Sequence, residues 1–339
     1  MAHPDQPLPL LAADALRRIA RDEGIKAYIE NDPILSPLLL RVTRRYIGGT
    51  TRAECLDTAA ALNRAGHATT MDYMGESARD ADLAARETEE FVSLAADIGR
   101  YGLDSSLSLD LSHIGLAVDP AVALSNARRI AAAARDIGTE MIISMEGSER
   151  TDAILEVYRT LCAEFDNVGI RLQARLRRTE ADLPAMLALP GKVCLVKGAY
   201  DEAPEVADPR DSPEVAARYR AYARRLIASG RPVSIDTHDA AIHADLHVYI
   251  DAEGMRDHPF EFEVLVGLGD AQIDQLRRWG YPTRVYVVYG REWYLYVCHR
   301  LAEDPSRLYR ALADAVGLDG APVPVAGATE GRSTLSPHR

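Results

Sequence analysis

Polar side chains recur where short apolar segments of this chain end. A polar group inside an apolar segment needs a hydrogen-bond partner or a ligand. For any single residue a satisfied interior group is the simpler interpretation, but together these residues favour one functional site at which the segment ends meet. The residues concerned are Asp72, Glu76, Asp110, His113, Ser144, Glu146, Gln173, Lys197, Tyr200, Asp236, Thr237, His238, Tyr286 and Tyr289.

The segment 195–200, Leu-Val-Lys-Gly-Ala-Tyr, is the most informative of these ends. Lys197 closes an apolar run, and the small pair Gly198 and Ala199 would let a ligand approach the backbone. A lysine beside exposed N–H groups suits a phosphate. The segment therefore indicates a phosphate-bearing cofactor, although an ordinary strand-to-loop turn could have the same sequence.

A helix is predicted over residues 293–305, ended by Pro305. Tyr296, His299, Arg300 and Glu303 are spaced so that they share one face of it. Because a guanidinium forms a two-pronged pair with a carboxylate, this face could hold a substrate carboxylate. A solvent-exposed charged stripe would have the same pattern, so both interpretations stay open.

A metal site is the weaker interpretation of the histidines near residue 240. His238, His243 and His247 occur close to Asp236 and Asp239. His243 and His247, however, are expected within a helix that follows the strand, away from the strand ends. We therefore expect no metal.

Charge and composition exclude several classes of function. The chain has 339 residues with 39 Lys and Arg against 51 Asp and Glu, a net charge of −12. An acidic chain lacks the basic footprint that nucleic acids or a broad anionic membrane surface require. Four widely spaced cysteines without CxxC pairing, no secretory signal and no apolar stretch of membrane-spanning length predict a cytoplasmic protein without an integral membrane segment. Peripheral attachment to the inner face of the membrane stays open.

Alternating strands and helices must position the polar residues. Helical stretches fall at 79–98, 120–137, 151–165 and 212–228, between apolar segments that resemble buried strands. This α/β alternation favours a (β/α)8 barrel, because the doubly wound alternative usually has a glycine-rich phosphate turn that residues 73–77 lack. We expect an N-terminal extension at 1–40, the barrel at 41–310, and a helix end with a flexible tail at 311–339. The predicted strands are 67–75, 106–111, 140–146, 168–174, 193–198, 232–238, 260–267 and 284–289.

Taken in order, several of these segments resemble bacterial monofunctional proline dehydrogenases over about residues 40–306. The resemblance implies a distorted TIM-like barrel with N-terminal helices and a C-terminal helix that covers a noncovalent FAD. It also implies oxidation of a C–N bond by hydride transfer to flavin N5, with a quinone or another acceptor taking the electrons. The segments are 72–76, 145–152, 172–183, 195–200, 236–238, 260–265 and 284–290, followed by the helix that starts at Trp293.

The resemblance also implies roles for individual residues. Gln173 would bind the flavin ring, Thr237 and His238 the ribityl–pyrophosphate region, and Glu303 the far end of the cofactor. Arg300 would hold the substrate carboxylate. Further cofactor positions are Met145, Cys194, Val196, Lys197, Gly198, Ala199 and Arg210, and the substrate pocket would be walled by Tyr200, Leu265, Tyr286 and Tyr296.

The substrate pocket departs from the family pattern in its charges. The strand-two lysine of the family is Asp110 here, its strand-three aspartate is Ser144, and its arginine near flavin N5 is Cys194. The first of its two adjacent arginines is His299, and the second is kept as Arg300. Charges in a water-poor pocket interact strongly, so we expect weaker selection for a free carboxylate.

Asp110 could instead attract a substrate ammonium group or accept its proton. Proline, another cyclic or secondary amine, or a substrate with a masked carboxylate then becomes the expected amino-acid or amine substrate. FMN is the less favoured cofactor; it is considered because Arg210 is followed by Asp211, where the family usually has two basic residues. A catalytically silent, ligand-binding relative and a metal-dependent barrel hydrolase that uses His238 remain as alternatives.

Overall fold

Eight parallel strands close into a barrel in the computed structural model, which describes residues 7–75, 77–200 and 202–316. Each strand pairs with the next along the chain, and the last pairs with the first. The predicted (β/α)8 fold is therefore confirmed, with each strand close to its predicted place. The strands are β1 (Ala68–Tyr73), β2 (Ser105–Leu109), β3 (Met141–Ile143), β4 (Val168–Gln173), β5 (Val193–Val196), β6 (Val233–Asp236), β7 (Phe260–Leu265) and β8 (Thr283–Tyr289).

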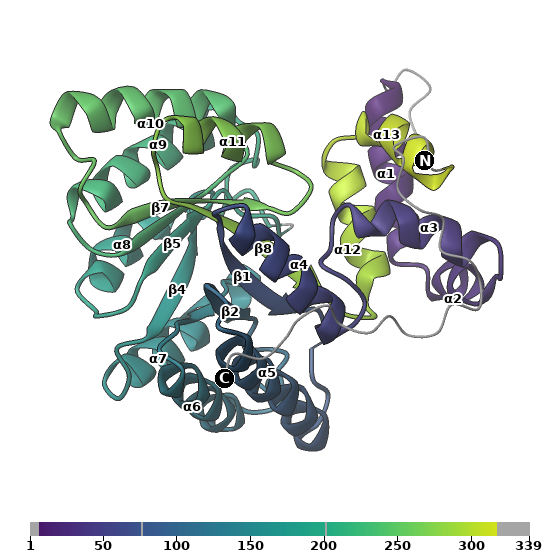
Figure 1. Cartoon of the computed structure of the whole chain (residues 1–339), viewed down its shortest axis with the longest axis horizontal. Helices are drawn as coiled ribbons and strands as arrows, with labels where there is room; N and C mark the ends of the chain where they lie inside the picture. The colour runs from purple at the N-terminus through teal and green to yellow at the C-terminus, as the bar shows by residue number, and fades with distance from the viewer. Residues whose placement is uncertain (1–6, 76, 201, 317–339) are drawn as a thin grey trace.

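Helices surround the barrel (Figure 1). The four predicted amphipathic stretches are all helical, and Ser212 begins one of them as an N-cap whose hydroxyl accepts a hydrogen bond from the Val215 N–H at 3.2 Å. The surrounding helices are α4 (Arg52–Arg64), α5 (Ala81–Tyr101), α6 (Pro120–Asp136), α7 (Thr151–Cys162), α8 (Thr179–Leu187), α9 (Pro213–Ala228), α10 (Ala240–Glu253) and α11 (Asp270–Arg278), with a short 3-10 helix, η1 (Ser148–Arg150).

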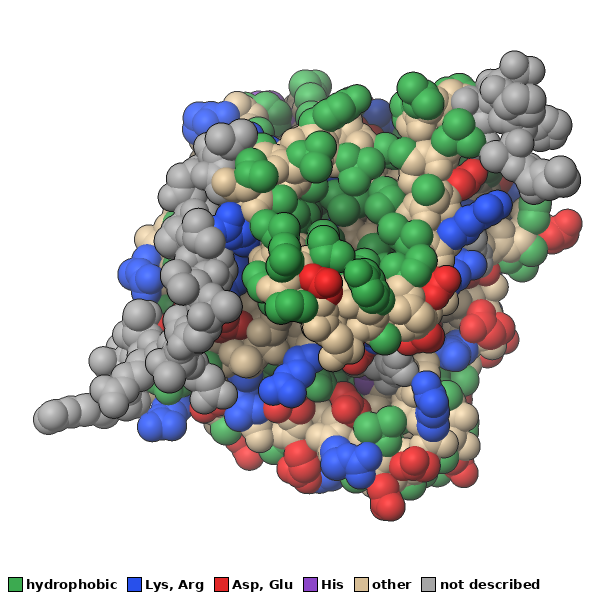
Figure 2. Space-filling view, turned by 90° about the vertical axis from the view of Figure 1, so that its right-hand side faces the viewer, with side chains coloured by type: hydrophobic (Ala, Val, Ile, Leu, Met, Phe, Trp, Pro, Cys, Tyr) green, Lys and Arg blue, Asp and Glu red, His purple; other side chains and the backbone are tan. Residues whose placement is uncertain are grey.

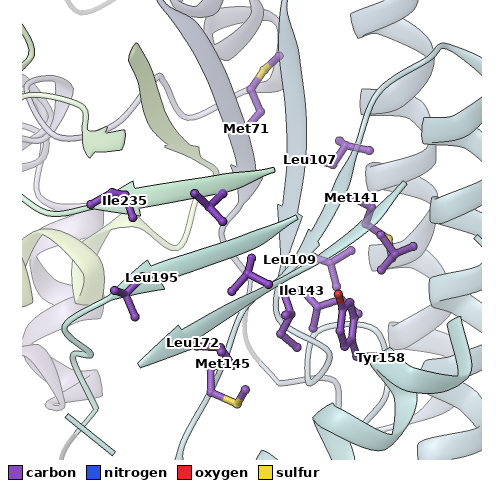
Figure 3. Packing of buried hydrophobic residues seen from close by; sticks show 14 of the residues in the cluster. Met71, Leu107, Leu109, Met141, Ile143, Met145, Tyr158, Leu172, Leu195 and Ile235 are labelled. Atoms are coloured by element: carbon purple, nitrogen blue, oxygen red, sulfur yellow. The ribbon is translucent and has the colours of Figure 1, made fainter. Parts of the chain in front are cut away.

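The hydrophobic core lies between the strands and these helices. Alternate residues of a strand point to opposite faces, and one set, which includes Met71, Leu107 and Leu195, joins Tyr158 of α7 in a single buried cluster (Figure 3). The other set faces the barrel interior and is largely polar, as Arg171 and Glu263 illustrate. The barrel interior is therefore largely polar up to its mouth, while the apolar side chains of the strands face the helices.

A second group of helices stands beside the barrel. It combines α1 (Leu8–Ala20), α2 (Glu23–Asn31) and α3 (Leu35–Arg44) with α12 (Trp293–Glu303) and α13 (Arg307–Ala315) from the other end of the chain (Figure 1). A separate buried cluster that includes Leu16 and Tyr294 holds them together, and Tyr286 and Tyr296 pack against it. The predicted division at residue 40 falls inside α3. The domain boundaries remain a prediction, and residues 317–339 lie outside the described part.

The helical group exposes several large apolar side chains, among them Leu8, Tyr28, Ile34, Tyr309 and Leu312. Figure 2 looks at the molecule from this side and shows hydrophobic side chains gathered there. Within the described ranges, no helix combines the length and apolar character that crossing a membrane requires.

Candidate functional site

Polar side chains from β8, β1, β2 and β3 meet at one side of the barrel mouth. The Tyr286 hydroxyl donates to Asp72 Oδ2 at 2.5 Å and lies 3.0 Å from Ser108 Oγ. Ser108 Oγ is in turn 3.2 Å from Ser144 Oγ. The predicted residues Ser144 and Tyr286 are thus brought together through Ser108, which the sequence did not single out.

Asp110 stands just beyond β2, beside Tyr200. Burial raises the pKa of the Asp110 carboxyl to about 6; the charge of Glu146 adds to the rise, and a hydrogen bond with Tyr200 opposes it. The Asp110 charge, followed by burial, in turn raises the pKa of Tyr200. Asp110 can therefore gain and lose a proton near neutral pH while Tyr200 stays protonated.

Asp72 behaves differently from Asp110. Burial and the nearby charge of Asp110 hold the pKa of Asp72 well above its usual range, although its bond from Tyr286 opposes this. Two close carboxyl groups in a dry site do not ionise together. Asp72 Oδ1 is buried and has no hydrogen-bond partner in the part of the chain that the structure describes. Asp72 can thus offer a ligand a protonated carboxyl group.

The opposite side of the mouth has a narrow cradle between β4 and the loop after β5. Gln173 is 2% exposed, and its Nε2 donates to the Glu146 carbonyl at 2.8 Å. Its Oε1 has no partner among the described residues. Gly198 has φ +104°, and a Cβ there would lie 2.4 Å from that oxygen. A ligand N–H group would satisfy Gln173, and glycine keeps the space open for it.

The start of α10 lies next to this cradle. Lys197 Nζ pairs with Asp239 at 2.9 Å, and Asp239 is the N-cap residue whose carboxylate accepts from Ala241 N–H at 3.0 Å. Asp239 N–H also donates to Thr237 Oγ1 at 3.2 Å. The predicted phosphate-binding lysine is therefore held at a helix N-terminus, which itself favours anions.

His238 is a neutral link between β6 and β7 in this structure. Its Nε2 accepts a hydrogen bond from Leu265 N–H at 2.9 Å, and burial followed by the Arg300 charge lowers its pKa to about 3. Across residues 7–75, 77–200 and 202–316, no three His, Cys, Asp or Glu side chains are placed to hold a metal ion. His247 instead stacks on Trp279 with ring centroids 4.2 Å apart.

Helix α12 brings its predicted face to the mouth. Arg300 pairs with Glu303 at 2.7 Å and lies over the Tyr296 ring at 5.1 Å. Arg210 also pairs with Glu303, at 2.6 Å. Burial would raise the pKa of Glu303, but these two arginines hold it below its usual value. Burial and Arg300 lower the pKa of His299, which leaves Arg300 as the cation of this face at neutral pH.

Comparison with known proteins shows the relationship directly. The family model described as proline dehydrogenase matches residues 55–307. The chain belongs to the proline dehydrogenase family. It is 33% identical over 263 residues to proline dehydrogenase 1 of Bacillus subtilis subsp. natto, covering 78% of this chain and 87% of that protein. It is also 33% identical over 269 residues to proline dehydrogenase of Deinococcus radiodurans, covering 78% and 86%.

Solved structures support the fold alone, because their sequence identity is low. Proline utilization A (PutA) from Bdellovibrio bacteriovorus superposes with a TM-score of 0.73 at 17% identity. The match covers 96% of this chain and 42% of that chain, so this chain spans less than half of the PutA chain's length. The shared barrel agrees with the family assignment.

Two predicted cofactor positions of this proline dehydrogenase family member, Met145 and Cys194, are buried. Met145 packs in the cluster between strands and helices. Cys194 is 1% exposed inside the barrel, and burial raises the pKa of its thiol to about 12. Val196 and Leu265 are the last residues of β5 and β7, and Ala199 lies in the loop after β5. The roles of all these residues remain predictions.

Sequence reasoning missed the ionic layer below the mouth. Arg171 forms ion pairs with Asp236 and, at 3.1 Å, with Glu263. The Thr70 hydroxyl donates to Glu263 at 2.5 Å. A signal was present, because Arg171 and Gln173 alternate with apolar residues in β4 and so share its inner face.

Proposed function

We propose that this chain is a flavin-dependent dehydrogenase that oxidises the C–N bond of proline or a related cyclic amine. The observation that carries the proposal is the convergence of Asp110, Tyr200, Tyr286 and Arg300 around the mouth of a proline dehydrogenase barrel. Neither a silent relative nor a metal hydrolase draws comparable support. We also propose a cytoplasmic location, where the four free cysteines would stay reduced.

The cradle residues fit FAD. The unpartnered Gln173 Oε1 would accept a ring N–H, and Gly198 and Ala199 would let the ring approach the backbone. Lys197, which pairs with Asp239 in this structure, would turn to receive a phosphate oxygen. Bound FAD supplies the hydride acceptor. We favour FAD over FMN because Arg210 and Glu303 offer paired polar groups to the far end of the longer cofactor.

The side chains at the mouth would prepare the substrate for oxidation. A protonated amine cannot use its lone pair to expel hydride from the neighbouring carbon. Asp110, with its pKa near 6, would accept the ammonium proton, after which the lone pair forms the C=N bond as the hydride leaves. The Tyr200 hydroxyl would stabilise ionised Asp110 by a hydrogen bond, and Tyr286 and Tyr296 would line the pocket around the substrate ring. A quinone is the acceptor that we expect to reoxidise the cofactor.

The charges of the mouth favour an amine over a free amino acid. Asp110 replaces the lysine that the family resemblance places there, and His299 is uncharged at neutral pH. Arg300, already paired with Glu303, is left to hold a carboxylate. We therefore expect pyrrolidine or prolinamide, which lack a free carboxylate, to be oxidised with higher kcat/KM than proline.

Steady-state turnover with an artificial electron acceptor tests this preference. The same assay on Asp110→Lys combined with Ser144→Asp should shift kcat/KM toward proline, because the pair restores the family's charges at the strand-two and strand-three positions. A wild-type preference for proline at ordinary efficiency would refute the altered substrate while leaving the dehydrogenase proposal intact. No turnover of any cyclic amine by flavin-loaded protein would refute the proposal itself.

A further inference from the structure

Arg171 lies directly below the mouth and links four strands. It is 8% exposed and stands two residues before Gln173 on the inner face of β4. Its guanidinium pairs with Asp236 of β6 and Glu263 of β7. It also stacks on the Tyr286 ring of β8, with Cζ 4.9 Å from the ring centroid. One buried cation therefore contacts both the ionic layer and the wall of the substrate pocket.

Arg171 is the registered partner of Cys194 on the neighbouring strand β5. Registered residues of parallel strands share a face, so both side chains belong to the same interior layer. Cys194 is 1% exposed, and burial keeps its thiol protonated. At this level of the barrel the positive charge is therefore carried by Arg171 of β4, and its neighbour on β5, Cys194, carries none.

We propose that Arg171 is a positioning residue of the dehydrogenase, which fixes Tyr286 and supplies from β4 the positive charge that Cys194 does not supply from β5. This inference rests on the proposed function. A cation below the flavin-binding mouth stabilises the negative charge that a flavin ring gains on reduction. The same guanidinium keeps Tyr286 aimed at Asp72 by holding the face of its ring.

The midpoint potential of the bound flavin tests whether the charge of Arg171 acts on the flavin. Arg171→Met should lower it, and the exchange variant Arg171→Cys with Cys194→Arg should restore it. Arg284→Met is the matched control, because Arg284 is 9% exposed and pairs with Glu261 at 2.8 Å, two residues before Tyr286. It should leave the potential unchanged. If Arg171→Met does not fold, adding Glu263→Gln removes one of the two carboxylates that the change would strand. A smaller lowering is then expected, because a negative charge is lost together with the positive one.

A double-mutant cycle tests the positioning part. Its substrate is whichever of proline and pyrrolidine the wild type oxidises faster. Arg171→Met should reduce kcat/KM about tenfold in the wild type and clearly less in a Tyr286→Phe background, where only the loss caused by the lower flavin potential remains. Additive losses, or an unchanged potential in flavin-loaded Arg171→Met, would overturn the inference alone. A wild type that binds no flavin would overturn the proposed function as well.

Discussion

Replacing Asp110 with asparagine should make the protein more stable and less active. Burial raises the pKa of this carboxyl from 3.8 to about 6. The folded state therefore holds the proton more tightly than the unfolded chain does. As the pH rises from about 4 to 6, the unfolded state loses its proton first, and ionised Asp110 destabilises the fold above that window by up to about 3 kcal/mol.

Asp110→Asn removes this penalty because an amide has no charge to bury. Chemical unfolding at pH 7.5 should show the variant more stable than the wild type by up to about 3 kcal/mol, and the difference should vanish near pH 4. Asp257→Asn, at an exposed position, is the control and should change stability by less than about 0.5 kcal/mol at either pH.

Activity should change in the opposite direction. If ionised Asp110 accepts the substrate proton, wild-type kcat/KM falls as the pH drops through about 6, and this acidic limb is absent in Asp110→Asn. Turnover at pH 7.5 should fall about 100-fold or more, the usual contribution of a general base. An Asp110→Asn variant that keeps the limb near pH 6 and most of its turnover would refute the reasoning.

Two further predictions concern the cradle and α12. Gly198→Ala should weaken FAD binding at least about tenfold in equilibrium titrations of the apoprotein, because the new Cβ would lie 2.4 Å from Gln173 Oε1 and φ is +104°. Gly230→Ala is the control, because Gly230 also has a positive φ (+65°) but no described atom lies within 4 Å of the new Cβ. This control should lower the free energy of unfolding by about 1 kcal/mol and leave FAD affinity unchanged. Equal losses of affinity in both would contradict the cradle. Arg300→Met should raise KM for proline about tenfold, because the substrate carboxylate loses its guanidinium partner. KM for pyrrolidine, which has no carboxylate, should stay within about twofold. Glu303 is not left without a partner, because it keeps its bond from Arg210. A matching rise for both substrates would show that Arg300 does not read the carboxylate.

The barrel could be predicted from the sequence because each strand carries its own local signal. Apolar residues such as Ile170 and Leu172 must be buried, and the helices between strands are amphipathic. The strand ends then place Asp110 and Gln173 at one mouth by the geometry of the fold. The hydrophobic pattern of each segment and the topology of the barrel were together sufficient to predict that Asp110 and Gln173 lie at the mouth.

The pairing within the ionic layer could not be predicted in the same way, although the position of Arg171 on the inner face of β4 could. Arg171 and its partner Glu263 are 92 residues apart, and nothing local shows that a charge inside a strand has a partner. The helical group beside the barrel is a similar case, since α1 packs against α12 from the opposite end of the chain. Such long-range pairings depend on the closed barrel and not on the pattern of either segment.

The visible spectrum of the purified protein tests the central claim most directly. The account predicts the absorbance bands of an oxidised flavin, release of FAD on denaturation, and bleaching when a cyclic amine is added without oxygen. Protein that stays colourless after incubation with FAD, and shows no spectral change with proline, pyrrolidine or prolinamide, would contradict it.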